Sequence, residues 1–96
     1  MRSSNPKPLA DILSTALKQL GLGTKIKQYE LLNLWDQIVG EQIAKVTTAE
    51  SIRDGKLFIN VKHSAWRNEL QYLKQELIQK INEKMNQEII KDIIFR

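Results

Sequence analysis

The basic residues of this 96-residue chain are the side chains best suited to a chemical role, because lysine and arginine neutralise phosphate groups. Arg67 and Lys74 are seven residues apart, a spacing that places them on one side of a helix. A solubilising surface is the competing interpretation of the same residues. The candidate nucleic-acid-binding set is Lys18, Lys25, Lys27, Lys56, Lys62, Arg67 and Lys74.

The charge of the whole chain points in the same direction without naming a partner. The net charge is +4 and the calculated pI is about 9.5. Residues 1–28 hold five basic side chains and one acidic one. Residues 29–55 hold two basic and five acidic side chains, and residues 56–96 hold eight basic and five acidic side chains. A basic field attracts nucleic acid or another anionic surface, so the two ends of the sequence are the more suitable regions for such contacts.

Catalytic chemistry has much weaker support in the sequence. His63 is the only histidine, and Ser64 follows it at an expected strand-to-helix junction, where sequence neighbours rarely form a hydrolytic pair. Gly21-Leu22-Gly23 lacks the length and the Lys-Ser/Thr ending of a phosphate loop. With no cysteine and one histidine, we expect no enzyme activity, no metal and no cofactor. The remaining candidates for acid–base work are scattered carboxylates: Asp36, Glu41, Glu50 and Asp54.

Two helices are predicted before any strand. Residues 1–7 are polar and predict a flexible arm rather than a signal peptide. Apolar residues then recur at helical spacing from Leu9 to Leu20, and Gly21 ends that helix. Thr24 is the predicted N-cap of a second helix with a wide apolar face. Gly40 breaks this helix, and Glu41–Lys45 adds one further turn.

A hairpin, a long helix and a closing strand are predicted next. Asp54-Gly55 is a strong hairpin turn between strands Thr47–Arg53 and Lys56–Lys62. Ser64 is the predicted cap of a third helix, whose apolar stripe runs from Trp66 to Met85. Glu88–Arg96 is the expected closing strand. Ile89, Ile93 and Phe95 are placed on one face of that strand, and Ile90 and Ile94 on the other.

These elements predict a small α+β fold in the order α-α-β-β-α-β, with a three-stranded sheet and the helices on one face. Residues 8–96 form one domain, and no apolar run is long enough to span a membrane. The strand order stays open. Trp35 and Trp66 could stack on bases or anchor a partner, but each falls on the apolar stripe of its helix. The predicted core is Trp35, Ile38, Leu57, Ile59, Val61, Trp66, Leu70, Leu73 and Phe95.

Four blocks taken in order resemble the short bacterial family related to DciA. They are Trp35–Gly40, Asp54–Leu57, Ser64–Leu70 and Ile93–Arg96. The resemblance runs from about Leu9 to Arg96. It implies a KH-like fold and a cytoplasmic, non-enzymatic role in DNA replication, with the replicative DNA helicase as partner and with helicase loading on DNA as the activity. The Gly-x-x-Gly loop of many nucleic-acid-binding KH domains is missing, so base-by-base recognition of the KH type is not expected.

Two functional hypotheses follow. The favoured one is a module that binds DNA, single-stranded or tailed, or the replicative helicase, or both. The alternative is a protein–protein adaptor without nucleic-acid binding, for which exposed Phe58, Ile90 and Ile94 would be the signature. Neither hypothesis involves a membrane or a small-molecule substrate.

Overall fold

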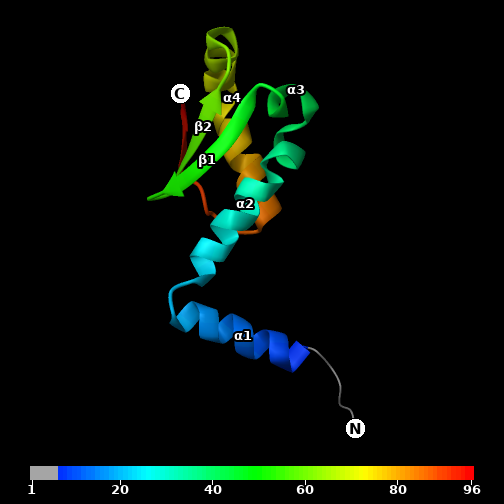
Figure 1. The fold of residues 1–96 in the computed structure, drawn as a ribbon, viewed down its shortest axis with the longest axis vertical. Helices are drawn as coiled ribbons and strands as arrows, with labels where there is room; N and C mark the ends of the chain where they lie inside the picture. Colours follow the sequence, from blue (N-terminus) through cyan, green and yellow to red (C-terminus); the bar gives the residue numbers. More distant parts are fainter. Residues whose placement is uncertain (1–6) are drawn as a thin grey trace.

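The computed structural model describes residues 7–96, and within the first helix it describes the side chains of residues 9, 11–16 and 19 (Figure 1). Its elements follow the predicted order α-α-β-β-α-β, with the turn predicted after Gly40 forming a short separate helix, and so confirm the α+β fold class. Lys7 already belongs to the first helix, and the rest of the predicted arm lies outside the described residues. The elements are α1 (Lys7–Gln19), α2 (Gly23–Val39), α3 (Glu41–Ala44), β1 (Thr47–Arg53), β2 (Lys56–Val61), α4 (Ser64–Met85) and β3 (Asp92–Phe95).

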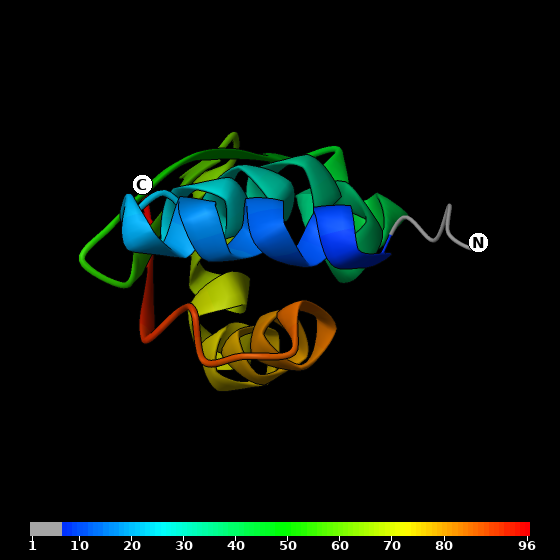
Figure 2. The same cartoon turned by 90° about the horizontal axis from the view of Figure 1, so that it is seen from below.

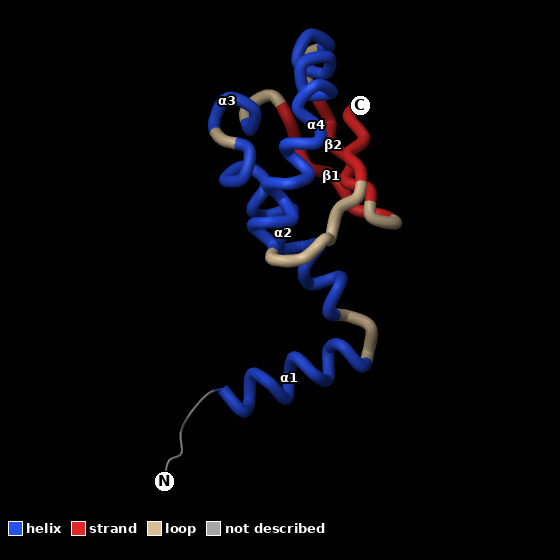
Figure 3. The backbone as a smooth tube through the Cα atoms, turned by 180° about the vertical axis from the view of Figure 1, so that it is seen from behind, coloured by secondary structure: helices blue, strands red, loops and turns tan. Residues whose placement is uncertain are grey.

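The sheet has the strand order β1-β2-β3, which the sequence left open. β1 and β2 are antiparallel, and Asp54 and Gly55 join them with positive φ angles of 53° and 75°, as a tight hairpin turn requires. β2 and β3 are parallel, and α4 makes the connection between them. Seen from behind in Figure 3, α2 and α4 lie over one face of the sheet. Among the described residues, no helix lies over the opposite face.

The core lies between that covered face and the two long helices. Leu57 and Ile59 of β2 point into it, as alternation along the strand predicts, and both are fully buried. Trp66 is only half-buried and packs against the edge of the core, as Ile38 and Leu73 also do. The other predicted core residues are buried: Trp35, Val61, Leu70 and Phe95.

Trp35 joins α2 to the start of β1 through its indole nitrogen. The Nε1–H group donates a hydrogen bond to Thr47 Oγ1 at 3.0 Å, and the Thr47 hydroxyl donates to the carbonyl oxygen of Ile43 at 2.7 Å. Trp35 is 1% exposed and Thr47 is 5% exposed. Buried polar groups are costly without partners, so this chain of bonds both fills the core and fixes where the sheet begins.

The two predicted N-caps are wrong by one or two residues. Leu22 is the N-cap residue of α2, and Thr24 lies inside its first turn. Gly21, with a φ of 74°, reverses the chain so sharply that the next helix begins almost at once. His63, in an extended conformation, occupies the N-cap of α4, and Ser64 is its first helical residue. Thr24 and Ser64 therefore indicated the region in which each helix begins, but neither is the N-cap residue itself.

The predicted closing strand Glu88–Arg96 is too long, since β3 covers only Asp92–Phe95. Residues before it form an irregular segment that Asn82 of α4 holds. Asn82 Oδ1 accepts hydrogen bonds from the backbone N–H groups of Ile89 and Ile90, and Asn82 Nδ2 donates to the carbonyl oxygen of Ile90, all at 3.0 Å. This segment turns Ile89 and Ile90 both into the core, so the predicted placement of these two residues on opposite strand faces is wrong.

Replacing Asn82 with alanine is expected to destabilise the fold by about 2–4 kcal/mol, because it leaves the buried N–H and carbonyl groups of Ile90 without partners, while the Ile89 N–H keeps only its 2.9 Å bond to the Gln87 carbonyl oxygen. Urea unfolding with intact protein checks the change in free energy. Asn82→Asp is the matched control: its carboxylate still accepts both N–H groups but cannot donate to Ile90, so it should lose less than alanine. Equal stability of Asn82→Ala and the original chain would contradict this role.

No helix among the described residues is both long and apolar enough to cross a membrane.

Candidate nucleic-acid interface

The hairpin end carries two cations in direct opposition. Arg53 and Lys56 are cross-strand partners on either side of the Asp54-Gly55 turn, and both are exposed on the helix-free face. Like charges that stand directly opposite each other on a sheet are destabilising. An anion placed between them would offset that repulsion, so this end of the sheet is a candidate for contact with phosphate.

Phe58 places an aromatic ring beside this pair. The guanidinium carbon of Arg53 lies 5.2 Å from the centre of the Phe58 ring, and that of Arg96 lies 4.9 Å from it. Both distances fall within the range of cation–π attraction, which holds the two guanidinium groups over the ring. Arg96 also donates from Nε and Nη2 to Glu50 Oε1, at 3.3 and 3.2 Å. The result is an ordered set of planar groups on which a nucleic-acid base can stack.

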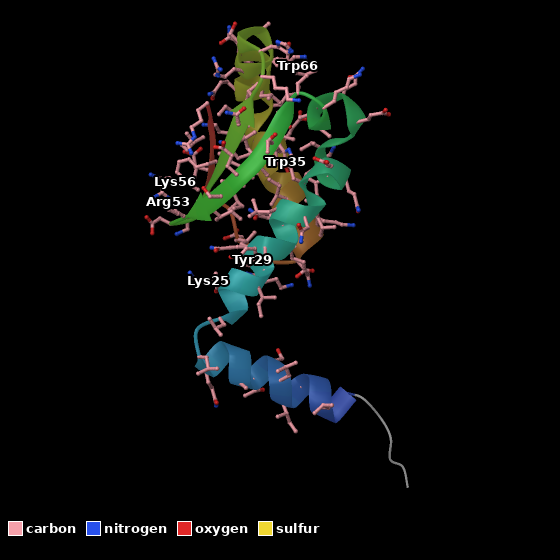
Figure 4. All side chains as sticks on the ribbon, viewed as in Figure 1. Lys25, Tyr29, Trp35, Arg53, Lys56 and Trp66 are labelled. Carbon is pink, nitrogen blue, oxygen red and sulfur yellow. The ribbon has the colours of Figure 1, made fainter. Side chains whose placement is uncertain are left out.

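A groove between α2 and β1 continues this surface. It encloses about 230 Å³ and has Leu32 and Ile52 among its apolar lining residues. Lys25 and Tyr29 also line it, and Tyr29 is 69% exposed. Figure 4 shows Lys25, Arg53 and Lys56 on the same side of the molecule. We call this surface the basic face; its residues are Lys25, Tyr29, Arg53, Lys56, Phe58 and Arg96.

The basic face combines the two chemistries that single-stranded nucleic acid requires. It holds four cations, of which only Arg96 forms an ion pair, with Glu50 at 3.2 Å, among the described residues. It also holds an exposed tyrosine and a half-buried phenylalanine. Cations along a groove bind the phosphates of the backbone, and aromatic rings stack on bases without selecting a sequence.

Lys74, predicted to contact nucleic acid, has an intramolecular partner instead. Its Nζ lies 3.1 Å from Asp92 Oδ1, and the same oxygen accepts a hydrogen bond from the Ile93 N–H at 2.8 Å. The hydrogen bond from Lys74 is the main cause that lowers the pKa of Asp92 below its ordinary value of 3.8, and burial opposes it. Lys74 therefore closes the edge of β3 against α4, which leaves it less suited to phosphate.

Asp92→Asn should reveal this ion pair through its pH dependence. Because the folded pKa of Asp92 is lowered, its contribution to stability is present above the unfolded pKa and is lost as the pH falls through the folded value. The stability difference between the original chain and Asp92→Asn should thus be modest at pH 7 and should shrink as the pH is lowered from 7 toward 2. Urea midpoints over this pH range measure it, and a constant difference would contradict the assignment.

The other predicted basic residues are spread over the molecule. Lys25 and Lys56 belong to the basic face, but Lys62 follows the opposite end of β2. Lys27 is half-buried and lines a cavity between α1 and α2. Arg67 is half-buried, and its Nε has no hydrogen-bond partner among the described residues. The side chain of Lys18 lies outside the described set.

Four members of the basic face were missed by the sequence prediction: Tyr29, Arg53, Phe58 and Arg96. Of these four, only Arg53 could have been predicted from the sequence. The two residues that flank a two-residue turn are cross-strand partners, which places Arg53 opposite Lys56. Arg96 reaches Phe58 only because β3 is parallel to β2, which the sequence did not determine.

The residues considered for catalysis do not form a cluster that could hold a metal. Within residues 7–96, no group of three or more His, Cys, Asp or Glu side chains has that arrangement. Glu50 is occupied by Arg96, and His63 is exposed at the start of α4.

The fold and the basic face define a small α+β module with a surface suited to an anionic polymer. The chain matches the family model described as DciA, Dna[CI] antecedent, over residues 8–95, and it belongs to that family. It is 32% identical to a UPF0232 protein of Corynebacterium glutamicum over 85 residues, which are 88% of this chain and 48% of the relative. It is also 27% identical over 89 residues to a UPF0232 protein of Rhodococcus jostii, covering 93% of this chain and 47% of that relative. The chain thus spans about half the length of these relatives.

Proposed function

We propose that this protein is a cytoplasmic, non-enzymatic accessory module of DNA replication with a KH-like fold, which binds single-stranded DNA through its basic face and assists the loading of the replicative helicase. Membership of the DciA family supports the connection to replication. The observation that carries the DNA-binding part is the opposed pair Arg53 and Lys56 beside the stacked Phe58 ring.

The strand of DNA lies along the helix-free end of the sheet and enters the groove between α2 and β1. Arg53 and Lys56 bind one phosphate between them, and Lys25 binds a neighbouring phosphate. Tyr29 stacks on an unpaired base at the groove. A base in a duplex keeps both faces stacked on its neighbours and cannot use this ring, so single-stranded DNA is the preferred form.

Fluorescence anisotropy with a labelled oligothymidine tests this function. We expect binding at low salt that weakens with added salt, with a slope of log K against log salt of about −1.4 for two phosphate contacts on a single strand. Sedimentation with the replicative helicase of the same bacterium tests the second part. Absence of binding to both DNA and helicase at low salt would contradict the proposal.

Fewer exposed residues support the adaptor hypothesis than support DNA binding. Of its three predicted apolar residues, Ile90 is 1% exposed and belongs to the core, so it cannot contact a partner. Phe58 and Ile94 remain half-buried on the helix-free face, and the two arginines lie over Phe58. Binding of helicase that is unchanged by charge reversal at the basic face, with no DNA binding, would favour this alternative.

A further inference from the structure

α1 presents an apolar stripe that the rest of the described chain does not cover. The molecule extends 60 × 25 × 19 Å, and its radius of gyration of 16.4 Å exceeds the value of about 12–13 Å that is typical of a compact domain of this length. Figures 1 and 2 show why: α1 lies beyond the end of α2 that is remote from the sheet. The exposed apolar residues of this stripe are Leu9, Ile12, Leu13 and Leu20, and Leu22 and Ile26 at the start of α2 are also exposed.

Such a helix needs a partner to be stable. α1 has 13 residues, and isolated helices of that length are marginal in water even with favourable sequences. Its side chains Leu9 and Leu20 are each 71% exposed, and Ile12 is 66% exposed. α1 is therefore stabilised when its stripe packs against another apolar surface.

We propose that the cover is a second copy of this chain, with the two α1 helices antiparallel across a twofold axis. The stripe is self-complementary in this arrangement. A centre between residues 14 and 15 places Leu9 opposite Leu20 of the second copy, and Leu13 opposite Ala16. The small Ala16 side chain, next to the axis, lets the two helices approach closely.

The size of the stripe fits a weak dimer. Leu9, Ile12, Leu13 and Leu20 are 59–71% exposed, which leaves roughly 270 Å² of apolar surface if each full side chain offers about 100 Å². Because interfaces are a little over half apolar, this corresponds to roughly 950 Å² in total for the two copies, the size of a weak interface that forms at high protein concentration. The dimer leaves Lys25 and Tyr29 free, since they line the groove toward β1 while Ile26 faces the cavity beside α1.

This inference does not depend on DNA binding, and the oligomeric state tests it. Light scattering coupled to gel filtration of the full chain should give a mass near twice 11.1 kDa at high micromolar concentration. The double variant Leu9→Lys with Leu13→Lys should give the monomer mass. The urea midpoint for unfolding of the remaining domain, from α2 to β3, should be unchanged. Tyr72→Lys is the matched control: Tyr72 is 88% exposed on α4, and its replacement should leave the dimer intact.

A cysteine at position 16 tests the proposed register in a chain that otherwise has none. Ala16→Cys should form a disulfide-linked dimer on mild oxidation, whereas Thr15→Cys, on the opposite side of α1, should not. A monomer mass of the original chain at all concentrations would overturn the proposal, as would dissociation by Tyr72→Lys equal to that caused by the double variant.

Discussion

Reversal of both hairpin charges, Arg53→Glu with Lys56→Glu, is expected to weaken binding of single-stranded DNA on the order of 100-fold at low salt. Both side chains bind the same phosphate, and a tenfold loss for each corresponds to about 1.4 kcal/mol per side chain. The fold should tolerate the change, because both residues are exposed and the opposed pair keeps like charges. The slope of log K against log salt should also become shallower by about 0.7, the contribution of one phosphate on a single strand.

The matched control for this variant is Lys80→Glu with Lys84→Glu. Both lysines are exposed on α4, which lies on the covered face of the sheet, and the change in net charge is the same. If the total charge alone governs binding, the two double variants will lose equal affinity. A loss confined to the hairpin variant assigns the contact to the basic face, whereas equal losses would contradict that assignment.

Trp35→Ala is the substitution with the largest expected effect on stability, a loss of about 3–5 kcal/mol in the free energy of unfolding. The indole is 1% exposed between α2 and β1, and its removal leaves a cavity and an unpaired Thr47 hydroxyl oxygen. Because a domain of this size has only about 5–10 kcal/mol in total, the variant should be partly unfolded at 37 °C. Urea unfolding followed by circular dichroism measures the loss.

Two further tryptophan variants separate packing from hydrogen bonding. Trp35→Phe keeps most of the ring volume but removes the Nε1–H donor, so it should lose only about 1–2 kcal/mol. Trp66→Ala should lose less than Trp35→Ala, because Trp66 is half-buried at the margin of the core. A larger loss of unfolding free energy for Trp66→Ala than for Trp35→Ala would contradict the central position of Trp35 in the core.

The fold was predictable where a local pattern is sufficient. Asp54-Gly55 identified the hairpin, and the alternation of Leu57, Ile59 and Val61 identified the covered face of β2. The closing strand was overextended because Ile89 and Ile90 resemble strand residues. Asn82, seven residues upstream of Ile89, bonds their backbone and holds them in a non-strand conformation. No periodicity reveals such a long-range side-chain bond.

The candidate site was less predictable, because it depends on strand register. Lys74 was grouped with Arg67 through helical spacing, yet Asp92 neutralises it across the β3 edge. Arg96 and Arg53 are 43 positions apart in the sequence, and only the parallel pairing of β3 with β2 brings both to Phe58. Charge composition therefore indicated the kind of partner, while the sheet decided which cations could act together.

The most direct test of the proposed DNA-binding face is a map of backbone amide chemical shifts on titration with a short oligothymidine. We expect the largest shifts at Arg53–Phe58 and at Lys25 and Tyr29, with saturation at one strand per basic face. The amides of α4 near Lys80 and Lys84 should move little. Shifts centred on those α4 residues, or none at the hairpin under conditions where DNA binds, would contradict the assignment of the basic face.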